Sequence, residues 1–484
     1  MPSPAAADRL MRSLAFLDGA WVAADDGAIL EVRDPATNEI LTTVPNMGAA
    51  ETRRAIVAAE AAMKPWAAKT AGERARVLRR WFDLMMSEQE ALGRLLTREQ
   101  GKSLTEAKGE IAYAASFIEW FAEEGKRTYG DVIPTHDASK RLIAIRQPVG
   151  VVGAITPWNF PAAMITRKVG PALAAGCAVV LKPASQTPLS ALALAVLAEE
   201  AGLPKGLFNV LTGSASDIGG ELTSNPIVRK ISFTGSTEIG RTLMRQSAET
   251  IKKMSLELGG NAPFLVFDDA DIDAAVAGAV ASKFRNGGQT CVCTNRFYVQ
   301  SSVHDEFVAK LAQATAALKV GAGLEDGVQI GPLIDAKAVK KVEEHIADAV
   351  AKGATVVTGG QRHALGGTFF QPTVLSGVRP DMLICKEETF GPVAPVVRFE
   401  TEDEALRLAN ATEFGLAGYF YARDMGRVWR VAEAMETGMI GVNTGLISTE
   451  VAPFGGIKQS GLGREGSSHG IEDYLELKYI CMGL

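Results

Sequence analysis

The sequence predicts an α/β protein built around a buried parallel β-sheet, and three observations support this fold class. From residue 150 onward, short apolar runs alternate with stretches that have helical spacing. The runs are apolar at nearly every position, which is typical of strands buried on both faces of a parallel sheet. With 484 residues, the chain is long enough for two large or three ordinary domains.

The first predicted elements are helices between residues 48 and 126. Apolar residues recur there at spacings of three and four, and one long helix is expected over 71–101, with Gly101 as its end. Residues 141–147 alternate between two faces and predict a strand.

Buried strands joined by helices are predicted next. The strands are expected within 150–156, 177–183, 207–213 and 229–235, and a helix is expected over 188–204. Strands and helices that alternate in this way form right-handed βαβ units around a parallel sheet.

A second α/β segment is expected from about residue 257. In chain order it contains a strand at 262–269, a helix to about 285, a strand at 294–300, a helix from 304 and a strand at 354–360. Residues 472–484 predict one more strand, which would pair either with the 141–147 strand or with another chain.

Composition and charge exclude several classes of protein. Hydrophobic residues make up 47% of the chain and charged residues 22%, as in ordinary globular proteins. The net charge is -6 and no dense run of Lys or Arg occurs, so no nucleic-acid partner is expected. No segment offers about 18 uninterrupted apolar residues, so no membrane partner is expected and we expect a cytoplasmic protein. The five cysteines are an odd number, and reduced thiols are expected.

Two strand-to-helix junctions carry candidate ligand-binding residues. Gly235 to Gly240, within FTGSTEIG, nearly match a phosphate-binding loop, but Arg241 stands where that motif has lysine, so a nucleotide triphosphatase is a distant alternative. Backbone N–H groups at a helix N-terminus can still bind a pyrophosphate, and the other interpretation is a purely structural turn. Lys182 ends another predicted strand, where it suits a sugar hydroxyl or a phosphate, or is an ordinary surface lysine.

Two thiols follow a glycine-rich turn in the stretch KFRNGGQTCVCTNR, residues 283–296. Most cysteines are small buried hydrophobes, but Cys291 follows a flexible approach and has Arg285 six residues upstream, which favours a reactive thiol. The chain has five histidines and none lies in the loops expected at the sheet edge, which disfavours a Cys–His hydrolase. The candidate base is Glu257 in LELGGN, because a carboxylate can stay ionised near neutral pH.

Seven motifs stand in the order and spacing of the aldehyde dehydrogenase superfamily, which the chain resembles over essentially its whole length. They are TPWNFP, KPASQTP, FTGSTEIG, LELGGN, FRNGGQTC, EETFGP and PFGGIKQSGLGREG. Within the superfamily, the stretches SKFRNGGQTCVCTNR, MITRKVGPALAAG and GIEDYLELKY look most like succinate-semialdehyde dehydrogenases of the bacterial type.

The resemblance implies a fold and a division of the chain. A Rossmann-type dinucleotide-binding domain would comprise 1–126 and 148–256, and an α/β catalytic domain would comprise 257–450. A small β bridging element would comprise 127–147 and 451–484. The family's bridging element joins subunits, so a homo-oligomer, a tetramer or a dimer, is expected.

The resemblance also implies the catalytic roles. Cys291 would attack the aldehyde carbon, and the Asn159 amide with the backbone N–H of Cys291 would hold the resulting oxyanion. Hydride transfer to a nicotinamide would leave a thioester, which water activated by Glu257 would hydrolyse. No metal is implied.

The implied cofactor is NADP, with NAD possibly also accepted. Family members that strongly prefer NAD tend to carry a glutamate where Ser185 stands, and a carboxylate there would repel a 2′-phosphate. Ser185 removes that repulsion and can donate a hydrogen bond. The residues implied in cofactor binding are Thr156, Pro157, Trp158, Lys182, Ser185, Gly213, Phe233, Gly235, Ser236, Glu388 and Phe390.

The implied substrate is a small aldehyde with a distal carboxylate. Arg167, Arg285 and Ser448 would surround that carboxylate, with Phe160 and Phe454 as pocket walls. Ordinary ion pairing is the other interpretation of the two arginines. Succinate semialdehyde is the first choice, glutarate semialdehyde, one methylene longer, is the alternative, and a catalytically silent relative is a more distant one.

Cys293, two residues past Cys291, is a spare pocket thiol in this interpretation. Some relatives form a reversible Cys-x-Cys disulfide, so a redox role is the alternative, although such a small ring is strained unless the loop bends.

Overall fold

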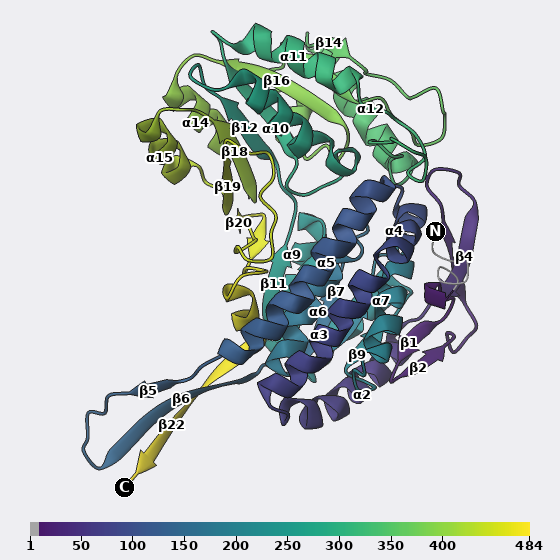
Figure 1. Cartoon of the computed structure of the whole chain (residues 1–484), viewed down its shortest axis with the longest axis vertical. Coiled ribbons are helices and arrows are strands. Elements are labelled where there is room, and N and C mark those ends of the chain that lie inside the picture. The colour runs from purple at the N-terminus through teal and green to yellow at the C-terminus, as the bar shows by residue number, and fades with distance from the viewer. Residues whose placement is uncertain (1–8) are drawn as a thin grey trace.

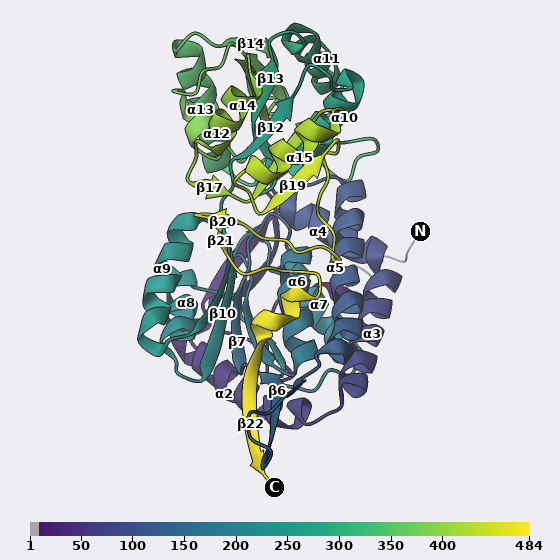
Figure 2. The same cartoon turned by 90° about the vertical axis from the view of Figure 1, so that its left-hand side faces the viewer.

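The computed structural model describes residues 9–484 and contains two large sheets, each covered by helices on both faces (Figure 1). The two α/β bodies lie one above the other, and a narrow arm of strands projects from the lower body (Figures 1 and 2). The mixed α/β fold class expected from the sequence is therefore confirmed. Within the described residues, no helix is both long enough and apolar enough to span a bilayer.

The sheet of the lower body has eight strands in the order β2-β1-β9-β8-β7-β10-β11-β21. The five strands from β9 to β11 are parallel, and β1 and β21 add to them in the antiparallel sense. The order is that of a doubly wound sheet, whose switch point lies between β7 and β10. The strands are β1 Ala15–Leu17, β2 Ala20–Val22, β7 Val151–Ile155, β8 Ala178–Lys182, β9 Phe208–Val210, β10 Val228–Thr234, β11 Lys253–Glu257 and β21 Gly461–Leu462.

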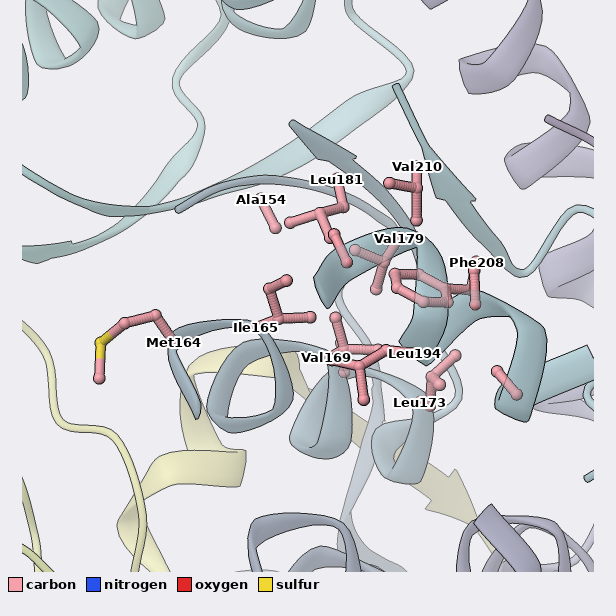
Figure 3. Packing of buried hydrophobic residues seen from close by; sticks show 14 of the residues in the cluster. Ala154, Met164, Ile165, Val169, Leu173, Val179, Leu181, Leu194, Phe208 and Val210 are labelled. Atoms are coloured by element: carbon pink, nitrogen blue, oxygen red, sulfur yellow. The ribbon is translucent and has the colours of Figure 1, made fainter. Parts of the chain in front are cut away.

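Helices cover both faces of this sheet. α2 and α8 pack on one face, and α6 and α7 pack on the other, with α3, α4 and α5 outside them. Figure 3 shows the contact on the second face, where Ile165, Val169 and Leu173 of α6 point towards Val179 and Leu181 of β8. The helices are α2 Ala49–Ala67, α3 Ala71–Ser87, α4 Gln89–Gln100, α5 Leu104–Glu124, α6 Ala163–Ala175, α7 Leu189–Glu200, α8 Ala215–Ser224 and α9 Thr237–Ser247.

The prediction of a single helix over 71–101 is wrong in one respect, because the helix is broken at Glu88 into α3 and α4. Glu88 leaves the helical region with φ -102° and ψ 14°, and its side chain pairs with Arg9 at 2.6 Å. Neither Gly nor Pro marks the break, so the sequence gives no local warning of it. The predicted end at Gly101 is confirmed, since this residue caps α4 at φ 98°.

The sheet of the upper body has seven strands in the order β14-β15-β16-β13-β12-β18-β19. One apolar cluster under α10 and α11 and another under α12, α14 and α15 fill its two faces. The strands are β12 Ala262–Val266, β13 Thr294–Gln300, β14 Thr355–Thr358, β15 Thr373–Ser376, β16 Val393–Phe399, β18 Ala417–Tyr421 and β19 Met439–Val442. The helices are α10 Ile272–Phe284, α11 His304–Ala316, α12 Ala336–Ala351, α13 Leu383–Lys386, α14 Glu402–Asn410 and α15 Met425–Ala434.

The projecting arm is a three-stranded antiparallel sheet. Its central strand β6 (Lys140–Pro148) pairs with β5 (Asp131–Ile133) and, along its whole length, with β22 (Leu475–Gly483). Of the two partners predicted for the last strand, the structure therefore uses the strand within the same chain. β22 lies at the edge of the arm, so one side of its backbone faces outward (Figure 1).

The segment that precedes β22 in the chain connects the two bodies. β20 (Ile457–Lys458) pairs with β17 (Phe414–Gly415) of the upper body, and three residues later β21 pairs with β11 of the lower sheet. A separate hairpin near the N-terminus joins β3 (Ile29–Arg33) to β4 (Ile40–Pro45).

Candidate active site

The predicted cofactor loops begin at one edge of the lower sheet. β7 ends at Ile155, β8 at Lys182, β10 at Thr234 and β11 at Glu257. Because these strands are parallel, their carboxyl ends meet at the same edge, where ligands of such sheets bind.

The loop that carries Cys291 is bent by residues in the left-handed region. Asn286 has φ 51°, Gly287 has φ 63° and Gly288 has φ 76°. A Cβ on Gly288 would lie 2.2 Å from the carbonyl oxygen of Gly391, so no side chain fits there. This turn ends α10 and aims the following residues at the space between the two bodies.

Hydrogen bonds join the Cys291 loop to the Asn159 loop. The Asn159 side-chain nitrogen donates to the Gln289 carbonyl at 3.1 Å, and the Asn286 side chain donates to the Asn159 carbonyl at 2.9 Å. Gly260, three residues after Glu257, touches the nucleophile loop, since a Cβ there would lie 2.4 Å from the Cys291 carbonyl oxygen. The loops of all three predicted catalytic residues therefore converge, and the second N–H of the Asn159 amide stays available to an oxyanion.

The Cys291 thiol is held in its protonated form by its surroundings. Burial raises the pKa of Cys291 to about 12, with the carboxylates of Glu388 and Glu257 adding to the effect and the Arg167 guanidinium opposing it. The site does not by itself stabilise a thiolate, so deprotonation has to accompany attack or follow ligand binding.

Glu257 ends β11 in a buried position. Burial, followed by the nearby Glu465 carboxylate, raises the pKa of Glu257 well above its usual value, while Arg167 and Lys168 oppose this. Its Oε2 atom is buried and has no hydrogen-bond partner. The sequence did not reveal that this carboxylate would be buried beside a second one.

Arg167 lies in a buried charge cluster. Its Nε atom is 2.5 Å from Oε2 of Glu465, and Lys168 binds the other oxygen of the same carboxylate. Its guanidinium lies over the Phe454 ring, 3.9 Å from the centroid. Ion pairing, the second interpretation of Arg167, thus accounts for one side of the guanidinium, while its Nη2 atom is buried without a hydrogen-bond partner.

A pocket of about 670 Å³ brings together three of the five predicted substrate residues, namely Phe160, Arg285 and Ser448. Arg285 lies over the Phe160 ring at 4.8 Å and forms no ion pair with any described residue, which leaves its charge free for a ligand. Arg167 and Phe454 are not part of this lining.

The predicted adenosine-side residues are adjacent. Lys182 donates to the Pro183 carbonyl at 2.8 Å and to the Ser185 hydroxyl at 3.4 Å, and burial lowers the pKa of Lys182 to about 8. Ser185 also lines a second pocket of about 600 Å³ beside the β3–β4 hairpin.

Two contacts beneath Gly235 constrain the predicted pyrophosphate loop. The Gly235 N–H donates to the Glu257 carbonyl at 3.0 Å, and a Cβ on Gly235 would clash with the Phe233 ring at 2.5 Å. Ser236 caps α9 by accepting a hydrogen bond from Ile239 N–H. The first turn of α9 therefore presents backbone N–H groups that suit an anion.

The predicted nicotinamide-side residues also meet. Phe390, with φ 54°, stands edge-on to Trp158 at 5.5 Å, and the Glu388 side chain accepts a hydrogen bond from Gly260 N–H at 3.2 Å. Burial raises the pKa of Glu388 to about 7. Thr156, next to Pro157 in the same loop, has a buried hydroxyl with no protein partner, as a ligand-binding group would.

Gly213 is placed differently from the other predicted cofactor residues. It forms a β-bridge with Met47, and a Cβ there would lie 2.2 Å from the Met47 carbonyl oxygen. This contact gives Gly213 a structural reason to be glycine.

Sequence reasoning missed a buried pair that supports the Asn159 loop. Lys102 binds Glu110 at 2.6 Å with both side chains about 1% exposed, and it also donates to the Asn159 carbonyl at 2.8 Å. Glu110 in turn accepts from the Ala162 N–H at 2.9 Å. The sequence offered no signal for this pair, because Lys102 and Glu110 lie among other polar residues around the start of α5.

Cys293 is fully buried and is not among the residues that line the pocket of Arg285. Its thiol donates to the Gly288 carbonyl at 3.2 Å, and the Lys283 ammonium lies 3.7 Å from its sulfur. Burial raises the pKa of Cys293 despite this lysine. Within residues 9–484, no group of three or more His, Cys, Asp or Glu side chains is placed to hold a metal ion.

The doubly wound sheet and the loops that meet at its carboxyl edge define the class of the protein, a mixed α/β enzyme with a ligand site at that edge. The chain belongs to the aldehyde dehydrogenase family, whose model matches residues 21–480. Members of this family oxidise aldehydes with NAD(P), and this chain is an enzyme of that family.

The similar proteins include several semialdehyde dehydrogenases. A glutarate-semialdehyde dehydrogenase from Pseudomonas aeruginosa is 69% identical, and a succinate-semialdehyde dehydrogenase [NADP(+)] from Escherichia coli strain K12 is 67% identical, each over 98% of both chains. The crystal structure of succinate-semialdehyde dehydrogenase from Burkholderia pseudomallei matches with a TM-score of 0.98 at 66% identity and covers 100% of both chains.

Proposed function

We propose that this protein oxidises succinate semialdehyde to succinate with NADP as the preferred cofactor. The observation that carries the substrate proposal is the pocket of about 670 Å³ with Arg285, Ser448 and Phe160 in its wall. Arg285 has no carboxylate partner among the described residues, so the distal carboxylate of the substrate would supply one. An uncharged aldehyde would leave this guanidinium without a direct ion-pair partner in a half-buried site.

The chemistry of the proposal uses the three converging loops. The Cys291 sulfur adds to the aldehyde carbon, and the free N–H of the Asn159 amide donates to the oxyanion as charge develops on it. A dinucleotide held by the loops after β7, β8 and β10 would supply the acceptor for the hydride of the thiohemiacetal carbon. Glu257 then takes a proton from the water that cleaves the thioester, a role that a raised pKa suits because the carboxylate becomes a stronger base.

The cofactor proposal depends on four groups. Lys182 and Ser185 would hold the adenosine side, the first turn of α9 the pyrophosphate, and Glu388 the nicotinamide ribose. A serine hydroxyl at position 185 tolerates a 2′-phosphate that a carboxylate would repel, and the 67% identical E. coli relative is named for NADP(+).

Glutarate semialdehyde is the second candidate substrate. A 69% identical relative carries that activity in its name, and one additional methylene changes binding by only about 1–3 kcal/mol. The pocket volume does not separate two substrates this similar.

Steady-state kinetics tests these proposals directly. The panel consists of succinate semialdehyde, glutarate semialdehyde, butanal and pentanal, each with NADP and with NAD. We expect kcat/KM for the carboxylated aldehydes to exceed that for the uncharged ones by about 100-fold or more. Equal values for succinate semialdehyde and butanal would overturn the substrate proposal, and the ratio between the two semialdehydes identifies the better substrate.

Two arginine variants test which side chain produces the preference for carboxylated aldehydes. Arg285→Leu should remove most of the preference for carboxylated aldehydes and leave kcat/KM for butanal nearly unchanged. Arg407→Leu, which alters an exposed arginine on α14, should change neither. A preference that survives in Arg285→Leu would mean that another group binds the carboxylate.

We also infer separate roles for the parts of the chain and an oligomeric assembly. The elements within 1–126 and 148–256 would bind the dinucleotide, while those within 257–450 would carry the nucleophile. The elements within 127–147 and 451–484 would join subunits through the outward edge of β22, giving a dimer or a tetramer.

A further inference from the structure

Tyr113 lines the substrate pocket, but neither the sequence motifs nor the proposed mechanism assigns it a role. It lies on α5 and lines the same pocket as Arg285, Ser448 and Phe160. Its ring packs edge-on against Phe117, one turn further along the helix, at a centroid distance of 4.9 Å. This contact fixes the ring and therefore the direction of the hydroxyl.

The Tyr113 hydroxyl has no hydrogen-bond partner although it is buried. Buried phenol groups nearly always have a partner, because an unsatisfied one loses its bond to water without replacement. Such an orphaned donor in a ligand pocket is explained most simply by a ligand that accepts from it.

The charges around Tyr113 indicate what that ligand is. Burial raises the pKa of Tyr113, and the two groups that oppose this most are the Arg167 and Arg285 guanidiniums, with Glu465 and Glu450 acting weakly in the opposite sense. The phenol therefore stays protonated at neutral pH and can only gain by donating to an acceptor. The Arg285 guanidinium, which forms no ion pair with any described residue, favours an anionic acceptor over a neutral one.

The geometry points to Tyr113 as a specificity residue that donates a hydrogen bond to the distal carboxylate of the substrate. This inference rests on the proposed function, since it concerns the same pocket. Arg285 and the Tyr113 hydroxyl then bind the carboxylate together, and Ser448 completes the set of donors. An aldehyde that ends in a methyl group offers no acceptor and leaves the hydroxyl unsatisfied.

Tyr113→Phe is the decisive variant because it removes one oxygen atom and keeps the ring and its contact with Phe117. We expect KM for succinate semialdehyde to rise about tenfold, in line with a hydrogen bond to a charged group, while kcat stays within about twofold. For butanal, kcat/KM should not change. The ratio of kcat/KM for the two substrates does not depend on how much of the variant is folded.

A binding measurement without turnover complements the kinetics. Succinate, added alone, should raise the unfolding temperature of the wild-type protein, and the shift should be smaller in Tyr113→Phe. Tyr421→Phe is the matched control, since Tyr421 is a buried tyrosine of β18 outside the pocket lining. It should behave as the wild type in both experiments.

The outcomes separate this inference from the proposed function. If the wild type prefers succinate semialdehyde to butanal and Tyr113→Phe keeps its KM, the role of Tyr113 is overturned and the substrate proposal stands. An equal loss with both aldehydes would show a structural hydroxyl and would also overturn it. A wild type without any preference for the carboxylated aldehyde overturns both.

Discussion

The thiol of Cys291 should react with iodoacetamide at a rate that rises about tenfold for each pH unit between pH 6 and pH 10. The pKa of Cys291 is raised to about 12 by burial and by the Glu388 and Glu257 carboxylates. At pH 7, about one molecule in 100,000 then carries the thiolate, which is the reactive form. The ionised fraction, and with it the alkylation rate, increases about a thousandfold from pH 7 to pH 10. A cysteine activated to a pKa near 7 would instead level off above about pH 8.

Peptide mass spectrometry of the ligand-free enzyme measures this rate. Trypsin releases residues 286–296, which contain Cys291 and Cys293, and fragmentation distinguishes the two sites. The exposed Cys481 lies in a separate peptide and reports the behaviour of the reagent itself. Cys291→Ala identifies any background signal.

Two variants test the electrostatic explanation. Glu388→Gln removes a carboxylate that raises the thiol pKa, so the Cys291 rate at pH 9 should increase. Arg167→Met removes the cation that lowers this pKa, so the rate should decrease. A plateau in the wild-type rate below pH 9, or changes of the opposite sign, would refute the reasoning.

Three further predictions concern the surroundings of the site. Glu465→Gln leaves Arg167 and Lys168 buried without a counter-charge and should lower the free energy of unfolding in urea by about 3–5 kcal/mol; a loss below about 1 kcal/mol would mean that the cluster rearranges. Ser185→Glu should reduce kcat/KM for NADP relative to NAD by about tenfold or more, measured by initial rates, and an unchanged ratio would contradict the role of this position. Cys293→Ala should stay active, and if Cys293 is the redox partner, dithiothreitol should no longer restore activity after peroxide treatment; full recovery in the variant would exclude the switch.

The layout of the fold could be predicted because local signals and the tertiary structure agree. The run at 150–156 is apolar apart from Thr156, and the run at 229–235 carries the apolar Ile231 and Phe233. Both became central strands with both faces covered. Residues 294–300 were assigned as a strand with the bounds that the structure has. The same regularity predicts that the loops after β7, β8 and β10 share one edge of the sheet.

The sequence could not reveal contacts between segments that lie far apart in the chain. Glu465 neutralises Arg167 from nearly 300 residues away, and nothing near either residue indicates that pairing. The protonation behaviour of Glu257 follows from the same cluster, because its pKa depends on burial and on the Glu465 carboxylate. The orphaned hydroxyl of Tyr113 likewise became visible only when the pocket was assembled.

The connecting segment around β20 and β21 completes the surroundings of Arg167 late in synthesis. A ribosome delivers the thiol of Cys291 long before residues 454–465, yet these late residues supply the ring and the carboxylate that enclose Arg167. Arg167 therefore stays without this counter-charge until the late segment has folded back onto α6. A chain truncated before residue 454 would leave Arg167 and Lys168 without the carboxylate that compensates their buried charges.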